Sequence, residues 1–334
     1  MSKYPKVNYI GNKSSISKWI IDSFPITSGT ILDIFSGGAS VSYELKKRGF
    51  RTITNDILFS NFVLGKAIIE NSSIKLNEDV LNMRISEEKI NGKFLELEFL
   101  KNKLFFDYEV KELSKLVLIA NELDGSEKNI FLSLLRRAMI RKLPYSRMNV
   151  PWEQIKKLRD EEYSYEKYKR RRAYHNLSFE DHIKNNLNDY NNAIFDNSCE
   201  NKAYNLDALE MIDNLHDKVD LIYMDPPYPS TMNKYESFYG DFDKIFVQRK
   251  EHADYTNKLT FIKNLNKLIE FSATKSKYIA ISLNNSTNPN ETEIENIMRK
   301  YGEIRKFYKE HQYKVTNSIN KNSNIEILLL LMVE

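Results

Sequence analysis

The most constraining stretch of the sequence is an apolar run that ends in an acid, two prolines and an aromatic ring, Leu221–Tyr228. The consecutive apolar residues Leu221–Met224 predict a buried parallel strand. Proline cannot donate to a sheet ladder and holds the residue before it in extended geometry, so the strand must end near Asp225 and continue as a stiff turn. Because open α/β sheets bind ligands at the carboxyl ends of their strands, this turn predicts a ligand site.

The groups in this turn suit a planar base that carries an amino group. Asp225 and the carbonyl of Pro226 can accept two N–H donors, and Tyr228 offers a flat ring for stacking. An exocyclic amine is a weak nucleophile because its lone pair is delocalised into the ring. Two acceptors on its hydrogens favour the pyramidal, nucleophilic form. A strand that merely ends in a proline-rich turn is the alternative for this stretch taken alone.

Composition narrows the class of protein. The 334 residues suffice for one large or two ordinary domains, and a charged fraction of 29% argues against a membrane protein. The single cysteine, Cys199, excludes an intrachain disulfide and favours a reducing, cytoplasmic location. The N-terminus lacks the apolar core of a signal peptide. We expect neither a metal site nor a membrane partner.

Positive charge is concentrated in one block, residues 136–172. The block holds thirteen Lys or Arg and five Asp or Glu, a net +8, whereas the whole chain carries only +4. Tyrosines and Trp152 are interleaved with these cations. Basic residues mixed with aromatic rings are typical of surfaces that contact phosphates and stack on bases, so the block predicts a nucleic-acid partner. A solvated, Lys- and Arg-rich helix face is the alternative.

A nucleotide-binding βαβ unit is predicted near the N-terminus. Its parts are a strand over 30–35, a glycine turn over 36–40, a helix over 41–47 and a strand over 51–55. Asp56 follows the second strand, where an acid accepts hydrogen bonds from ribose hydroxyls. Gly37 and Gly38 are adjacent and Ala39 follows them, which is a poor pattern for pyrophosphate. A cofactor with ribose but no phosphate fits better, and a turn without any ligand is the alternative.

The rest of the chain predicts an α/β fold with a helical insertion. Helical periodicity over 61–200 indicates an inserted, mainly helical domain between catalytic parts 1–60 and 201–334. The stretch 230–243 is polar and aromatic without apolar periodicity, and we expect a loop that closes over a substrate. Further expected elements are a helix over 16–24 capped by Ser14 or Ser15, a helix over 256–271, a strand over 278–283, a helix over 291–301 and a hairpin of 304–313 with 324–333 around a loop over 315–322.

Several of these stretches together resemble the DNA adenine methyltransferases of the Dam-like class. Asp225–Tyr228 matches the catalytic motif of that class without a departure. Tyr9–Lys13 is similar to its N-terminal aromatic-x-Gly-Gly-Lys motif, with Asn12 in place of a glycine. Asp33–Ala39 is similar to its Phe-x-Gly-x-Gly motif, with alanine in place of the second glycine. The order of the motifs along the chain also fits, and the resemblance covers most of the chain.

Two further stretches resemble the recognition segments of adenine methyltransferases that accompany type IIS restriction enzymes. They are Arg141–Trp152 and Arg171–Asn176. The resemblance thus implies a type II or IIS restriction-modification system, with duplex DNA as substrate and a cognate restriction endonuclease that need not form a stable complex. It also implies a Rossmann-like sheet, S-adenosyl-L-methionine as methyl donor and the N6 amino group of a flipped-out adenine as acceptor.

The residues implied in each role fall into three sets. The catalytic set is Asp225, Pro226, Pro227 and Tyr228. The cofactor-binding set is Tyr9, Lys13, Asp33, Phe35, Gly37, Gly38, Asp56, Asp207 and Asp225. The DNA-binding set is Arg141, Lys142, Tyr145, Arg147, Asn149, Trp152, Arg170, Arg171, Arg172 and Tyr235.

Two other functions remain open at this point. The same cofactor could serve a methyltransferase that acts on RNA or on a protein amide, although those groups usually carry Asn in place of Asp225. A non-catalytic nucleic-acid binder could also retain the fold. The intact Asp225 and Tyr228 argue against the second alternative, and the large basic insertion favours DNA over a small protein substrate.

Overall fold

The computed structural model describes residues 2–229, 234–247, 251–311 and 324–334. The chain divides into two compact units. The helical unit consists of Met1–Asn12, Leu58–Asp196 and Glu236–Arg249, and the sheet unit consists of Lys13–Ile57, Asn197–Tyr235 and Lys250–Glu334. The helical unit therefore includes 61–196 of the predicted insertion 61–200, together with two segments, 1–12 and 236–249, that the sequence placed with the catalytic parts. The predicted loop over 315–322 lies outside the described residues.

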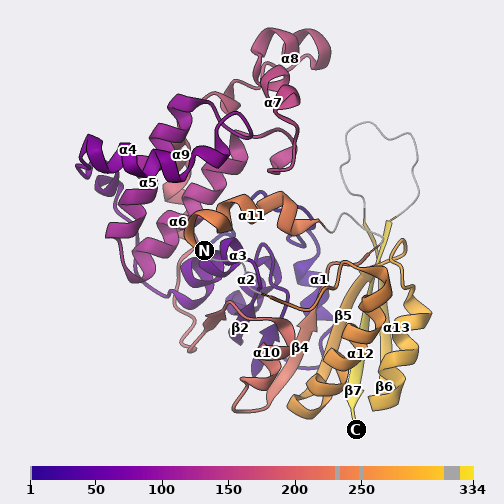
Figure 1. Cartoon of the computed structure of the whole chain (residues 1–334). Coiled ribbons are helices and arrows are strands. Elements are labelled where there is room, and N and C mark those ends of the chain that lie inside the picture. The colour runs from indigo at the N-terminus through magenta and orange to yellow at the C-terminus, as the bar shows by residue number, and fades with distance from the viewer. Residues whose placement is uncertain (1, 230–233, 248–250, 312–323) are drawn as a thin grey trace. The chain divides into compact units, whose positions relative to one another are not determined.

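The sheet unit is built on a seven-stranded sheet in the order β3-β2-β1-β4-β5-β7-β6, which confirms the predicted fold class (Figure 1). Strands β1 to β5 are parallel, whereas β7 runs antiparallel to both β5 and β6. The final pair is the predicted hairpin. The strands are β1 Thr30–Asp33, β2 Arg51–Asn55, β3 Lys202–Tyr204, β4 Val219–Met224, β5 Ser276–Asn284, β6 Gly302–His311 and β7 Asn324–Val333.

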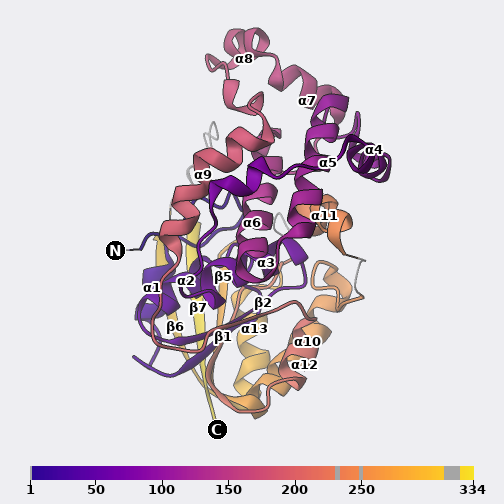
Figure 2. The ribbon, with the colours of Figure 1, turned by 90° about the vertical axis from the view of Figure 1, so that its left-hand side faces the viewer.

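Helices cover both faces of this sheet, because its central strands are apolar on both sides (Figure 2). On one face lie α10 Ala208–Asp213, α12 Lys258–Lys275 and α13 Glu291–Met298. On the other face lie α1 Ser17–Asp22 and α2 Ser40–Lys47. The predicted serine cap of α1 is wrong: its N-cap is Ile16, and no side chain caps it. The backbone of Lys13 instead accepts from the N–H groups of Ile16 and Ser17.

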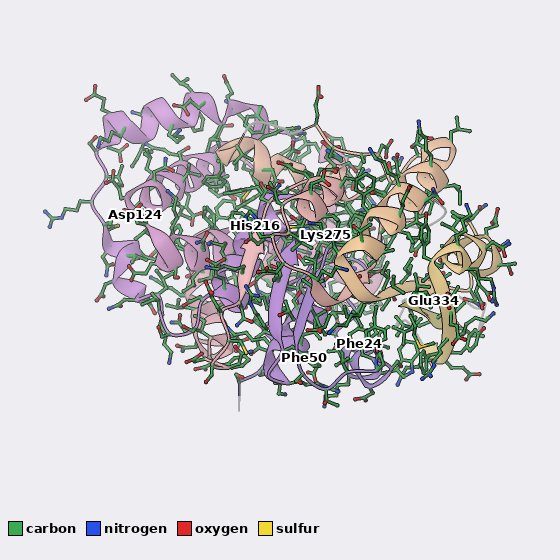
Figure 3. All side chains as sticks on the ribbon, turned by 90° about the horizontal axis from the view of Figure 1, so that it is seen from below. Phe24, Phe50, Asp124, His216, Lys275 and Glu334 are labelled. Atoms are coloured by element: carbon green, nitrogen blue, oxygen red, sulfur yellow. The ribbon has the colours of Figure 1, made fainter. Side chains whose placement is uncertain are left out.

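The strand order brings the two predicted motifs to one edge of the sheet. β1 pairs with β4 in parallel, with Asp33 opposite Tyr223, so the glycine turn and the Asp225 turn leave the sheet side by side. Figure 3 looks at the other edge of the sheet, where the parallel strands begin; the labelled Phe50, His216 and Lys275 precede β2, β4 and β5.

The helical unit is organised around α6 Gly125–Arg141, in which every residue from Ile130 to Ile140 is buried. Its other described α-helices are α3 Phe59–Gly65, α4 Glu87–Glu96, α5 Asp107–Glu122, α7 Trp152–Arg159, α8 Glu161–Tyr168, α9 Phe179–Ala193 and, from Glu236 on, α11 Tyr235–Phe246. A π-helix covers Lys66–Glu70, and short 3₁₀ turns cover Glu78–Asn82, Glu98–Leu100, Pro144–Ser146, Ala173–His175 and, in the sheet unit, Arg299–Tyr301. In the part of the chain that the structure describes, no helix is long and apolar enough to cross a membrane.

The prediction of a loop over 230–243 is wrong for most of that stretch, because Tyr235–Phe246 forms helix α11. Phe238, Tyr239 and Phe242 recur at helical spacing and are buried. The Asp243 carboxylate accepts hydrogen bonds from the first backbone N–H groups of α3, at 2.8 and 2.9 Å. The surrounding glutamate, serine and lysine residues hide this apolar face in the sequence. Residues 230–233 lie outside the described part.

Candidate active site

The glycine turn after β1 is held by Asp56. The Gly37 N–H donates to Asp56 Oδ2 at 2.8 Å, and Asn205 donates to the backbone carbonyls of Asp56 and Ile57. Ala39, which replaces the expected glycine, adopts a left-handed conformation with φ of 56° and starts α2. The position therefore favours glycine because of its backbone conformation, since a Cβ is costly there. Alanine completes the turn and keeps its methyl group buried.

Asp33, the last residue of β1, is a buried acid. Ser42 Oγ donates to Asp33 Oδ2 at 2.5 Å, whereas Oδ1 has no hydrogen-bond partner in the described structure. Burial raises the pKa of Asp33 to about 7, and the charges of Asp225 and Asp56 add to the rise against the opposing hydrogen bond from Ser42. The free oxygen is an acceptor that a bound donor group can use.

Asp225 faces a cation shared with a second carboxylate. Lys13 Nζ lies 3.5 Å from Asp225 Oδ1 and 3.4 Å from Glu326 Oε2, which reaches the site from β7. Burial raises the pKa of Asp225 to about 6; Lys13 opposes the rise and Glu326 adds to it. The Asp225 side chain keeps 23% of its surface exposed, while Glu326 is fully buried. The sequence does not single out Glu326, because one acid in an apolar strand near the C-terminus carries no motif of its own.

Tyr228 lies in the core of the sheet unit. Its hydroxyl donates to the carbonyl of Ser282 at 3.0 Å, and its ring packs 5.3 Å from that of Phe261. The residue is 3% exposed. Stacking on a base, which the sequence predicts for this ring, therefore requires a neighbouring residue to move away from one face.

Asp207 and Phe35 both contact the segment before α12. Asp207 caps α10 through the N–H of Leu209 at 2.9 Å, and its other oxygen accepts from the N–H of Ala253 at 2.8 Å. The ring of Phe35 meets that of Tyr255 edge to face at 5.2 Å. The structure thus gives Asp207 two local partners at the same sheet edge as Asp56.

The sequence of the chain matches a known protein family. The family model described as D12 class N6 adenine-specific DNA methyltransferase matches residues 9–325. The chain belongs to this family. It is 42% identical to Type II methyltransferase M2.HphI of Haemophilus parahaemolyticus over 98% of both chains. It is also 24% identical to Modification methylase StsI of Streptococcus sanguinis, over 97% of this chain and 51% of that protein. The protein is therefore an adenine-specific DNA methyltransferase, and its family implies S-adenosylmethionine as methyl donor.

Tyr9, another cofactor residue predicted for the methyltransferase, lies in the helical unit. Its ring stacks on that of Tyr239 at 5.2 Å, and the Tyr239 hydroxyl accepts from the N–H of Ile10 at 2.9 Å. The guanidinium of Arg136 lies 4.7 Å from the Tyr239 ring and donates to the carbonyl of Val7. These contacts fix the N-terminal segment against α6 and α11.

Part of the basic block of this methyltransferase is internal, and this part includes Lys142, one of the predicted DNA-binding residues. Lys142 is 1% exposed, with Nζ 2.8 Å from the Glu109 carboxylate, and Arg159 pairs with the same carboxylate at 2.6 Å. Burial alone would raise the pKa of Glu109, but Arg159 and Lys142 hold it below its usual value. Arg136 and Arg137 are buried as well. The charge of Lys142 is used inside the unit, and the structure does not support a DNA contact from it.

The other predicted DNA-binding residues of the helical unit lie closer to solvent. Arg141, Tyr145, Arg170, Arg171 and Arg172 line one cavity. Arg147, Asn149 and Trp152 lie in the sequence between the two stretches that line the cavity. The guanidinium of Arg147 lies 5.6 Å from the Tyr145 ring, Asn149 donates to Ser237, and Trp152 meets Phe106 edge to face. Tyr235, of the sheet unit, is half-buried at the start of α11.

Proposed function

We propose that Asp225, the Pro226 carbonyl and Tyr228 hold the adenine that this enzyme methylates, after the base has left the DNA duplex. The observation that carries the proposal is the position of Asp225. It directly follows β4 at the sheet edge, beside the turn after β1, with its carboxylate paired to Lys13. An adenine amino group inside a duplex cannot reach a site at this edge, so the base must flip out, at a cost of roughly a few kcal/mol.

The residues at this edge fit S-adenosylmethionine. Asp33 Oδ1 is a buried acceptor with no partner in the described structure. A cationic donor group of the cofactor would satisfy it. Asp56 and Asp207 end or follow neighbouring strands, and Phe35 adds an aromatic face. We assign the cofactor-binding roles to Asp33, Phe35, Gly37, Gly38, Asp56 and Asp207, with Lys13 and Tyr9 fixing the N-terminal segment. When bound, S-adenosylmethionine supplies an electrophilic methyl group.

The chain's own residues then prepare the amine for attack. The Asp225 carboxylate and the Pro226 carbonyl accept the two amino hydrogens, which orients the nitrogen lone pair. The amine becomes strongly acidic only after methylation, so Asp225 with a pKa of about 6 is basic enough to receive the proton. Its negative charge also stabilises positive charge that develops on the nitrogen. Tyr228 supplies a stacking surface worth about 1–3 kcal/mol.

The biological setting that the relatives support is restriction and modification. M2.HphI is named a type II methyltransferase, and StsI a modification methylase. We propose that this chain likewise protects DNA at a specific site from a cognate endonuclease, without a stable complex between the two proteins.

The decisive experiment compares wild-type protein with Asp225→Ala and Asp225→Asn. Transfer of a labelled methyl group to duplex oligonucleotides with adenine, cytosine or neither as acceptor reports the chemistry. We expect transfer only to adenine, and loss of transfer in both variants while DNA and S-adenosylmethionine still bind. Near wild-type transfer by Asp225→Ala would overturn the proposed mechanism. RNA and protein-amide acceptors in the same assay separate the competing substrate classes.

A further inference from the structure

Glu326 is a buried carboxylate at the catalytic turn. It is the third residue of β7, which follows the twelve residues after His311 and pairs with both β5 and β6. The residue is 0% exposed, and its Oε2 lies 3.4 Å from Lys13 Nζ. A carboxylate in the interior is costly unless it is paired, and an apolar residue usually serves the fold as well or better. Its position beside Lys13 therefore indicates a role in the site.

The ionisable groups around Asp225 come from four elements. Lys13 precedes α1, Glu326 lies on β7, Asp33 ends β1, and Tyr223 and Tyr228 lie on or after β4. Lys13 is the cation that contacts both Asp225 and Glu326. One ammonium is thus divided between two carboxylates, which leaves this group of three with one excess negative charge.

We propose that Glu326 is a positioning residue for methyl transfer. By binding Lys13, it keeps the ammonium beside Asp225 and prevents it from fully neutralising that carboxylate. This inference rests on the proposed role of Asp225. Glu326 touches neither substrate in this scheme and acts through Lys13. The geometry requires that the two partners affect Asp225 in opposite directions. Lys13 stabilises the ionised Asp225, and Glu326 disfavours it.

The test is the pH dependence of single-turnover methyl transfer with saturating DNA and S-adenosylmethionine. Rate should fall below the pH at which Asp225 gains its proton. In Glu326→Gln this acid limb should move to lower pH and the plateau rate should fall by about tenfold. In Lys13→Gln the limb should move to higher pH. Glu295→Gln is the matched control, because Glu295 is a buried, doubly paired glutamate on α13 outside the site.

Each result decides the matter. Opposite displacements of the limb in the two variants support the positioning role. A lower rate in Glu326→Gln with an unmoved limb, or movement in the same direction as in Lys13→Gln, would show that Glu326 is only structural. If Glu326→Gln does not fold, the acid limb of the methyl-transfer rate must still move to higher pH in Lys13→Gln. An active Asp225→Asn would instead remove the proposed function itself.

A separate observation concerns the cavity in the helical unit. The cavity has a volume of about 550 Å³, and four arginines line it: Arg141, Arg170, Arg171 and Arg172. Among the described residues, no acidic one lines it. Three of its lining residues, Tyr145, Ser146 and Arg172, have φ between 54° and 60°. Non-glycine residues adopt this conformation at a cost, and such strain gathers at ligand sites.

Three of these arginines lie over tyrosine rings, and Arg141 lies nearest to its ring. Its guanidinium stacks 4.0 Å from the centre of the Tyr174 ring, and its backbone carbonyl is 2.8 Å from Nδ1 of the buried His175. Among the described residues, no carboxylate forms an ion pair with it. A guanidinium held by stacking has lost its rotamer freedom in advance, so it can form two parallel hydrogen bonds with little further entropy loss.

We infer that Arg141 reads a guanine of the recognition site through the O6 and N7 acceptors of that base. Bidentate pairing of arginine with guanine is the commonest specific contact in the major groove, and a cavity without acids suits an acceptor edge beside phosphates. The inference rests on duplex DNA as the substrate. It distinguishes Arg141, which specifies sequence, from Arg170, which is exposed on the same cavity and is expected to contact phosphate.

The test begins with sequencing of methylated plasmid DNA, which gives the recognition site of the wild-type enzyme. Each guanine is then replaced by 7-deazaguanine, which lacks the N7 acceptor. Wild-type transfer should fall by roughly 10-fold to 100-fold at one guanine position. Arg141→Gln should lose discrimination at that position alone, whereas Arg170→Gln should weaken all sites alike. A site without guanine, insensitivity to every replacement, or uniform loss in Arg141→Gln would overturn the assignment.

Discussion

At the scale of single residues, Asp56 holds the glycine turn, and we propose that it also binds the ribose of the cofactor. It accepts from Gly37 and so holds the turn, and it stands where a ribose is expected. We expect Asp56→Ala to weaken S-adenosylmethionine binding by roughly 1–3 kcal/mol, because polar groups then lose their partner. Asp56→Asn keeps an acceptor for Gly37 and should lose less. Calorimetric titration measures both, with the exposed Asp22→Ala as control. Equal affinity in all three would release Asp56 from this role.

The ring and the hydroxyl of Tyr228 are expected to have different roles, which two substitutions can separate. The hydroxyl binds the Ser282 carbonyl, so Tyr228→Phe should lose about 0.5–1.5 kcal/mol of stability and keep most methyl transfer. Tyr228→Ala removes the ring, and we expect it to lose transfer as well as roughly 3–5 kcal/mol of stability. Urea unfolding and the methylation assay run on both proteins separate the two effects. A Tyr228→Phe enzyme as inactive as Tyr228→Ala would place the function in the hydroxyl.

At the scale of elements, a side chain of α11 caps the start of α3, and this contact helps to hold α11 in place. Asp243 of α11 accepts from the N–H groups of Phe59 and Ser60 at the start of α3. Loss of a capping acceptor usually costs about 0.5–2 kcal/mol, and two N–H groups are involved here. We expect Asp243→Ala to lower the free energy of unfolding by about 2 kcal/mol, and Asp243→Asn by less. Glu236→Ala, at an exposed position of α11, should be neutral in the same urea titration.

The sheet was predictable where pattern and chemistry agree, and α11 was not. Apolar runs bounded by glycine or proline placed β1, β2, β4 and the final hairpin close to their observed bounds. The apolar face of α11 is interrupted by charged residues, and its burial depends on partners more than a hundred residues away. The same holds for Glu326 and for Lys142, whose pairing with Glu109 depends on tertiary contacts. Local pattern cannot show which charges of a basic block point inward.

At the scale of the whole molecule, the chain is only mildly basic, so its affinity for DNA depends on where the charges lie. Arg136, Arg137, Lys142 and Arg159 are buried, which removes four of the thirteen cations of the basic block from direct phosphate contact. The exposed remainder includes Arg170 and Arg171, with the half-buried Arg172 beside them. We therefore expect the electrostatic part of DNA binding to come largely from the end of the block.

Salt dependence measures this contribution directly. Log affinity for duplex DNA falls linearly with log salt, with a slope of about 0.9 per neutralised phosphate. Simultaneous replacement of Arg170, Arg171 and Arg172 by Gln should reduce the slope by up to about 3 and weaken binding to all sequences alike. The control carries Gln at Lys75, Lys89 and Lys111, three exposed lysines of the same unit outside the block, and should keep the wild-type slope. A triple arginine variant whose slope equals that of the lysine control would mean that this end of the block is only a solvated surface and that the phosphates are bound elsewhere.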